Sequence, residues 1–120
     1  MKIAFSASEN TMDSPLDQRF GRAAMFIVYD TDKDTFTVVD NTQNLNAAQG
    51  AGIQSAQNVV NAGAKVLITG HTGPKAFRVL EAAKVETYLC PSGTVQNALD
   101  AWKKGELKMI SEADVEGHWV

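Results

Sequence analysis

Two arginines dominate a short stretch near the N-terminus, DSPLDQRFGRAAMF at residues 13–26. Arg19 and Arg22 flank Phe20 and Gly21 in a chain of 120 residues whose formal net charge is −3. General basicity therefore does not explain the pair. Guanidinium groups bind anions through charge-assisted and often bidentate hydrogen bonds, so this spacing indicates an anion site. The alternative is that both arginines face solvent and pair with neighbouring aspartates.

Two glycine-rich segments have the composition of a second and third side of such a site. They are Gln49-Gly50-Ala51-Gly52 and Gly70-His71-Thr72-Gly73-Pro74-Lys75. A glycine-rich turn before a helix presents backbone N–H groups at the helix N-terminus, where the dipole favours anions, and Lys75 adds a positive charge. The spacing is not that of a GxxxxGK[ST] phosphate loop. The alternatives are a tight turn for the later segment and a frayed first turn for the earlier one.

The chain has few residues that would ligate a metal directly. Cys90 is its single cysteine and His71 one of two histidines, so an internal disulfide and the cysteine-rich zinc and iron–sulfur patterns are excluded. His71 and Cys90 are the candidate metal ligands. The alternatives are a histidine with a structural hydrogen bond and a small buried hydrophobic residue. No GxSxG, HExxH or paired-carboxylate motif indicates an enzyme.

The elements that position these residues follow from the hydrophobic pattern. We expect strands at 2–6, 25–29, 35–39, 66–69 and 85–89, with a hairpin turn at 30–34. We expect helices around 53–60, from Pro74 onward and over 94–102. The connection over 7–21 is long and polar, which predicts a loop that is mobile without a ligand because few apolar residues can fix it.

This order predicts a single α/β domain over residues 1–120, with a core at about 2–105 and a C-terminal extension at 106–120. Right-handed crossovers give a five-stranded mixed sheet in the order 3-2-1-4-5 with helices on both faces. The chain connections diverge between the first and fourth strands, and ligands favour the crevice at such a switch point. We expect the arginine loop and both glycine-rich segments to meet there.

Composition limits the classes of partner. Hydrophobic residues make up 44% and charged residues 21% of the chain, and the isoelectric point is about 5.2. An acidic protein lacks the basic face that duplex nucleic acid requires. The N-terminus does not have a signal-peptide pattern, and no apolar run is long enough to span a bilayer. We therefore expect a cytoplasmic protein without nucleic-acid or membrane partners.

Three stretches together, LDQRFGRAAMFIVYD, AQGAGIQSAQ and VLITGHTGPKAFRVL, resemble the dinitrogenase iron–molybdenum cofactor biosynthesis family. The resemblance covers about residues 2–105. That family includes cofactor carriers of nitrogenase assembly and the orange protein of sulfate-reducing bacteria, to which this chain is similar in length and single-domain layout. The resemblance implies a ribonuclease H-like three-layer α/β/α fold without nuclease chemistry, and strand 2–6 indeed lacks the carboxylate that such a nuclease needs for its metals.

The resemblance also implies a function. The implied function is a non-enzymatic carrier of an anionic metal–sulfur cluster that cationic side chains and N–H groups hold. The implied cluster is a molybdenum–copper sulfide, or alternatively an iron–sulfur or iron–molybdenum cofactor precursor. Nitrogenase members often have a histidine where this chain has Gln49, which favours the molybdenum–copper interpretation. A MinD-like ATPase is the implied protein partner. The alternative function is a small regulatory or interaction module that binds a nucleotide or phosphate in the same crevice.

The predicted cluster-binding residues come from the arginine loop and the two glycine-rich segments. They are Arg19, Phe20, Gly21, Arg22, Gln49, Gly50, Gly52, Gly70, His71, Thr72, Gly73, Pro74 and Lys75. Phe20, Met12 and Met25 are expected to supply an apolar wall.

Overall fold

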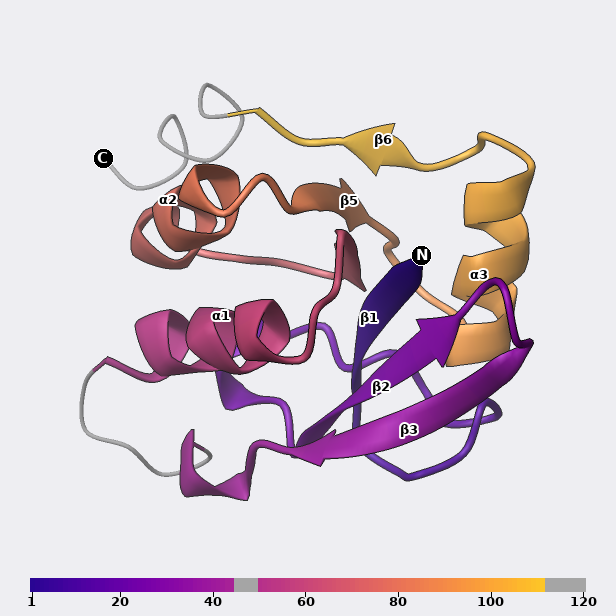
Figure 1. The fold of residues 1–120 in the computed structure, drawn as a ribbon, viewed down its shortest axis with the longest axis horizontal. Helices are drawn as coiled ribbons and strands as arrows, with labels where there is room; N and C mark the ends of the chain where they lie inside the picture. Colours follow the sequence, from indigo (N-terminus) through magenta and orange to yellow (C-terminus); the bar gives the residue numbers. More distant parts are fainter. Residues whose placement is uncertain (45–49, 112–120) are drawn as a thin grey trace.

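The computed structural model describes residues 1–44 and 50–111, and these form one open mixed sheet covered by helices on both faces (Figure 1). The strands are β1 (Lys2–Ala7), β2 (Met25–Asp30), β3 (Thr35–Asp40), β4 (Val66–Thr69), β5 (Glu86–Leu89) and β6 (Lys108–Met109). The helices are α1 (Ala51–Asn61), α2 (Pro74–Ala82) and α3 (Val95–Lys103), with short 3₁₀ turns η1 (Phe20–Arg22) and η2 (Thr42–Asn44).

The sheet order within the described residues is β3-β2-β1-β4-β5-β6. β1 pairs antiparallel with β2 and parallel with β4, which confirms the predicted neighbour of strand 66–69. The predicted order 3-2-1-4-5 is confirmed, but the number of strands is six because β6 pairs antiparallel with β5. This strand has only two residues and no alternating pattern, so periodicity could not reveal it. The preceding and following residues, Leu107 and Ile110, pack on the body of the domain.

Two apolar clusters hold the three layers together. On one face Ala56 and Val59 of α1 and Leu80 of α2 pack against Ala4, Phe26 and Leu67 of the sheet. On the other face Val95, Ala98 and Leu99 of α3 pack against Ile3, Phe5 and Ile68. The alternation along β1 sends successive side chains into opposite clusters. This is the three-layer α/β/α arrangement expected from the sequence. No helix among the described residues is long and apolar enough to cross a membrane.

The connection between β1 and β2 runs across the carboxyl ends of the central strands. Ser6 Oγ donates to Asp17 O at 2.6 Å and lies 2.8 Å from Thr69 Oγ1. The backbone N–H of Leu16 donates to Gly93 O at 3.0 Å, and the Leu16 side chain is buried. The sequence argument found few apolar residues to fix this loop, but these hydrogen bonds and Leu16 attach it to β1, β4 and the turn before α3.

β3 is an edge strand that the helices leave largely uncovered. Phe36 and Val38 are 39% and 43% exposed on the face that carries α3. The hairpin before it is fixed by Asp30, whose Oδ1 accepts the backbone N–H groups of Asp32 and Lys33. These donors, Asp32 first, hold the pKa of Asp30 below its ordinary value. After the strand, Thr42 N–H donates to Asp40 and lowers that carboxyl's pKa in the same way.

Gly70 permits the loop to cross the end of β4. An added Cβ on Gly70 would lie 2.6 Å from the Cα of Gln18. We expect Gly70→Ala to destabilise the domain by about 1–3 kcal/mol, the usual cost of overpacking, or more because backbone must move. Gly73→Ala is the matched control, since no atom lies within 4 Å of its added Cβ and its φ of −79° suits alanine. Urea unfolding measures both, and equal midpoints would contradict this account of Gly70.

The hairpin carboxylates predict a pH dependence of stability. Because the folded pKa values of Asp30 and Asp40 lie below the unfolded ones, their contribution is complete above roughly pH 4 and is lost as the pH falls through the folded values. Asparagine still accepts the same N–H groups but does not titrate. We therefore expect the double variant Asp30→Asn, Asp40→Asn to lose less stability than wild type between neutral and acidic pH in urea unfolding. Parallel losses would show that other carboxyls dominate.

Candidate anion-binding pocket

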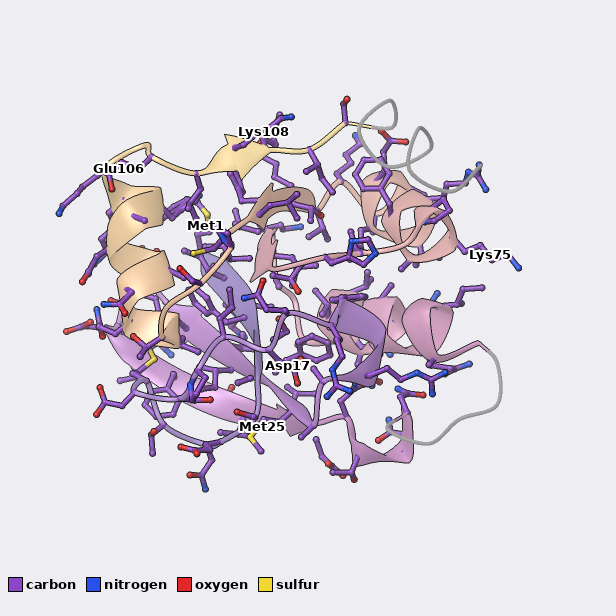
Figure 2. The ribbon with its side chains drawn as sticks, turned by 180° about the vertical axis from the view of Figure 1, so that it is seen from behind. Met1, Asp17, Met25, Lys75, Glu106 and Lys108 are labelled. Atoms are coloured by element: carbon purple, nitrogen blue, oxygen red, sulfur yellow. The ribbon has the colours of Figure 1, made fainter. Side chains whose placement is uncertain are left out.

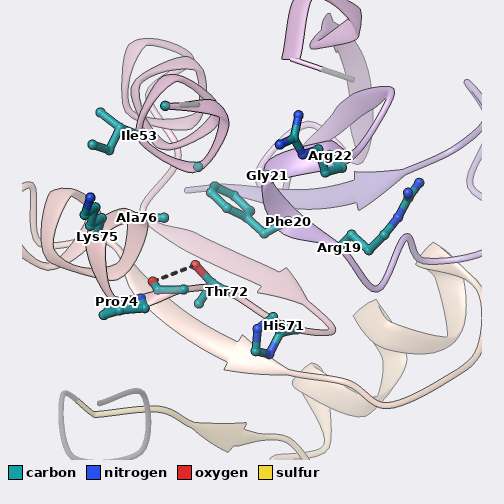
Figure 3. A pocket seen from close by; sticks show the side chains of 13 residues that line it. Arg19, Phe20, Gly21, Arg22, Ile53, His71, Thr72, Pro74, Lys75 and Ala76 are labelled. Carbon is teal, nitrogen blue, oxygen red and sulfur yellow. Dashed lines mark hydrogen bonds between the residues drawn. The ribbon is translucent and has the colours of Figure 1, made fainter. Parts of the chain in front are cut away.

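A pocket of about 670 Å³ opens where the sequence analysis placed the crevice, beside the carboxyl ends of β1 and β4. Three segments line it: η1 with the residue before it, the first turn of α1, and the β4–α2 connection with the start of α2 (Figure 3). The lining residues are Arg19, Phe20, Gly21, Arg22, Gly50, Gly52, Ile53, His71, Thr72, Gly73, Pro74, Lys75 and Ala76. The charged side chains in this described set, Arg19, Arg22 and Lys75, are all cationic.

Phe20 anchors the arginine turn to the core. Its side chain is buried, points toward Ala76 (Figure 3), and packs on Phe26 with 5.3 Å between ring centroids. Its backbone N–H donates to His71 O at 3.1 Å, which joins η1 to the β4–α2 connection. Phe20 therefore holds two walls of the pocket at a fixed separation and contributes apolar surface. The other expected wall residues, Met12 and Met25, pack on the cluster of the opposite sheet face and do not line the pocket.

The two arginines differ in their surroundings. The Arg19 side chain is 67% exposed, and its Nε lies 3.4 Å from Asp17 Oδ1. This salt bridge is the pairing that the alternative interpretation expected for one arginine. Arg22 is half-buried, and its Nη1 donates to the backbone carbonyl of Asn44 at 3.1 Å. This carbonyl is a neutral acceptor that helps to hold the guanidinium in place.

The start of α2 offers backbone donors to the pocket. Gly73 is the N-cap residue and Pro74 the first helical residue, and no side chain in the described part of the chain caps this helix. The N–H groups of the first turn lack partners within their own helix, so the positive end of the dipole remains available to an anion. Lys75 is exposed and extends outward from α2 (Figure 2).

Glycines bring the first turn of α1 close to η1. A Cβ on Gly21 would lie 3.1 Å from the Cα and N of Gly52, and a Cβ on Gly52 would lie 3.4 Å from that of Ala76. Gly50 precedes the helix with a φ of +78°, a left-handed conformation that glycine adopts without strain. The glycines predicted as ligand contacts thus also have packing roles, since they let η1, α1 and α2 meet around one cavity.

The structure brings together eleven of the thirteen predicted site residues in this pocket. The exceptions are Gly70, which lies beneath Gln18, and Gln49, which is outside the described residues. Sequence reasoning missed Ile53 and Ala76. Ile53 recurs with Ala56, Val59 and Val60 at helical spacing, a pattern that predicts the buried face of a helix, but it lies at the pocket with 37% exposure. Ala76 directly follows the segment from Gly70 to Lys75, so its position in the first turn of the helix that begins at Pro74 could have indicated a place at the pocket.

Direct metal ligation has little support from the described residues, among which no three His, Cys, Asp or Glu side chains are grouped to hold an ion. His71 is exposed and lines the pocket. Cys90 is buried outside it, and its thiol donates to Ser92 O at 3.2 Å. The two candidate metal ligands are therefore not brought together in the pocket. What the pocket offers an anion is three cationic side chains, backbone N–H groups and the apolar surfaces of Phe20 and Ile53.

Several proteins of known structure share this fold, and two of those described below are also similar in sequence. The structure aligns with the apo form of the orange protein from Desulfovibrio gigas at 38% identity, covering 92% of each chain with a TM-score of 0.88. It aligns with a NifB-like protein from Thermotoga at 37% identity, covering 90% of this chain and 91% of the other with a TM-score of 0.80. A dinitrogenase-like protein from Methanocaldococcus jannaschii shares the fold at 18% identity, 92% and 95% coverage and a TM-score of 0.66.

No curated protein matches the chain. The model of the dinitrogenase iron-molybdenum cofactor family matches residues 1–105. This match spans both glycine-rich segments and the arginine turn, and it agrees with the two structural relatives above 30% identity. The chain belongs to the dinitrogenase iron-molybdenum cofactor family.

Proposed function

We propose that this protein is a non-enzymatic binding protein or carrier for an anionic metal–sulfur cluster, held non-covalently in the pocket. The observation that carries the proposal is the lining itself: among the described residues, every charged side chain there is cationic, and none of the lining residues is a carboxylate or a thiol. A cluster that brings its own sulfide ligands needs charge-assisted hydrogen bonds and N–H dipoles rather than protein thiolates.

The dimensions of the pocket are compatible with such a ligand. Its volume of about 670 Å³ falls within the range of roughly 300–1,000 Å³ that is typical of small-molecule and cofactor sites. This volume is far larger than a single metal ion requires. Phe20, Ile53, Pro74 and Ala76 supply apolar contacts suited to polarisable sulfide. Similarity to the orange protein favours a molybdenum–copper sulfide over an iron–sulfur or iron–molybdenum cofactor precursor.

The alternative ligand is a nucleotide or a phosphate. The starts of α1 and α2, which no described side chain caps, line the same pocket, and helix N-termini bind phosphate as readily as other anions. The purified protein distinguishes the two ligands, since a bound metal–sulfur cluster absorbs visible light and a bound nucleotide absorbs only in the ultraviolet. A cytoplasmic location is a further proposal, as is a MinD-like ATPase partner, which rests on family resemblance. Co-purification with such an ATPase would test the partner.

Titration of the apo-protein with tetrathiomolybdate and Cu(I) tests the proposed function. We expect a coloured complex that saturates at a fixed metal-to-protein ratio, because charge and N–H donors converge on one cavity. Molybdate, which lacks sulfide, with the same copper serves as the control and should form no such complex. Absence of saturation with tetrathiomolybdate, or displacement of the colour by nucleotide at low concentration, would favour the alternative ligand.

The cationic side chains should carry much of the affinity. We expect Arg19→Ala, Arg22→Ala and Lys75→Ala each to weaken the complex by roughly tenfold or more, as loss of a charge-assisted hydrogen bond does, without unfolding the domain. Lys65→Ala is the matched control, because Lys65 is an exposed cation just before β4 and outside the pocket. Cys90→Ser should leave the affinity nearly unchanged. Normal binding by the arginine variants and loss of binding by Cys90→Ser would instead indicate a thiolate-ligated site.

A further inference from the structure

Asn41 follows β3 directly, with its side chain fully buried between the arginine turn and α1. Its Nδ2 donates to Ala23 O at 2.8 Å and to Ser55 Oγ at 3.0 Å. Its Oδ1 accepts from Asn44 Nδ2 at 2.8 Å and from Asn58 Nδ2 at 2.7 Å. One buried amide thus joins segments that are far apart in the sequence.

The partners fix the orientation of this amide. Ala23 O can only accept a hydrogen bond, so the atom facing it must be the NH₂ group. The other atom is therefore the carbonyl oxygen, and it accepts from the NH₂ groups of Asn44 and Asn58. Both donor hydrogens and the acceptor are used, and neither aspartate nor leucine could make the same set of contacts. A fully satisfied buried network of this kind specifies one local geometry.

The network reaches both sides of Arg22. Ser55 Oγ accepts from Asn41 and lies 3.2 Å from Gly21 O, to which it can donate. Asn41 itself holds Ala23 O. The carbonyl before Arg22 is therefore attached to α1 through Ser55, and the carbonyl of the residue after it is attached to the end of β3 through Asn41.

The same network also reaches the guanidinium. Asn44 N–H donates to Asn41 O at 3.0 Å, and the Asn44 side chain donates to Asn41 Oδ1. These two contacts fix the Asn44 carbonyl, which accepts from Arg22 Nη1 at 3.1 Å. Arg19 has a different setting, since it is 67% exposed and its ion pair is with Asp17, two residues away in the same loop.

We infer that the Asn41–Ser55–Asn44 network is a positioning device that holds Arg22 in its pocket-lining geometry before any ligand arrives, and that Arg19 lacks such preorganisation. The ligand part of this inference rests on the proposed function. A side chain already ordered loses less conformational entropy on binding, so Arg22 gives more affinity per hydrogen bond than a mobile arginine. Asn41, Ser55 and Asn44 act through Arg22 and need not contact the ligand.

A double-mutant cycle tests the inference. Ser55→Ala removes one hydroxyl and leaves the core otherwise filled. We expect it to weaken tetrathiomolybdate binding by roughly two- to tenfold, the size of one neutral hydrogen bond. In an Arg22→Ala background the same change should have no further effect, whereas in an Arg19→Ala background it should act in full. A loss of equal size in both backgrounds would overturn the inference and indicate a purely structural role for Ser55.

A second measurement needs no ligand and therefore separates this inference from the proposed function. In the apo-protein, ¹⁵N relaxation should show the Arg22 Nε–Hε group more ordered than that of Arg19, and Ser55→Ala or Asn41→Asp should reduce the order of Arg22 alone. Equal order of the two arginines in the wild type would overturn the positioning role. If the wild type binds no tetrathiomolybdate but Arg22 is selectively ordered, the proposed ligand is wrong and the positioning device stands.

Discussion

The close crossing of the β1–β2 loop over the carboxyl end of β4 determines where the pocket residues lie. Gly70 has no side chain, so the Gln18 backbone can approach it, and the Ser6 hydroxyl joins Asp17 O to Thr69 at the same place. The chain that leaves this crossing delivers Arg19, Phe20 and Arg22 directly beside the β4–α2 connection. A substitution that lifts the loop would therefore displace Arg19 and Arg22 together.

Much of the fold could be predicted because its signals are local. β-branched and aromatic runs mark the hairpin, glycine and proline mark the start of α2, and the parallel neighbour of β1 follows from crossover handedness. The sixth strand could not be predicted, since Lys108 and Met109 form it only because β5 offers them an unpaired edge. Nor could sequence place Met12, because the side of the sheet that a loop side chain joins depends on the path of the loop in space. Met25 begins β2, and strand alternation puts it on the face of Ile27 and Tyr29, opposite the pocket.

Most of the residues that line the pocket could be predicted from the sequence, but the residues that support them could not. Arginine, lysine and glycines at helix starts are recognisable as anion-binding groups, and the switch point of the sheet predicts where they lie. Asn41, Ser55 and Asn44 have no such signature, since an amide or a hydroxyl acquires its role only from the carbonyls that folding places beside it. Ile53 shows the same limit: its helical spacing predicted burial, but η1 and α2 leave it at the rim of the pocket.

The exposed edge of β3 has a consequence for how copies of this protein meet. A second molecule adding antiparallel to this edge, centred on Thr37, would set Asp34 of one copy opposite Asp40 of the other. Like charges directly across strands oppose pairing. These carboxylates therefore disfavour edge-to-edge association of two β3 strands, which the exposed Phe36 and Val38 would otherwise promote. The backbone donor that lowers the pKa of Asp40 extends the pH range in which this carboxylate stays charged toward more acidic values.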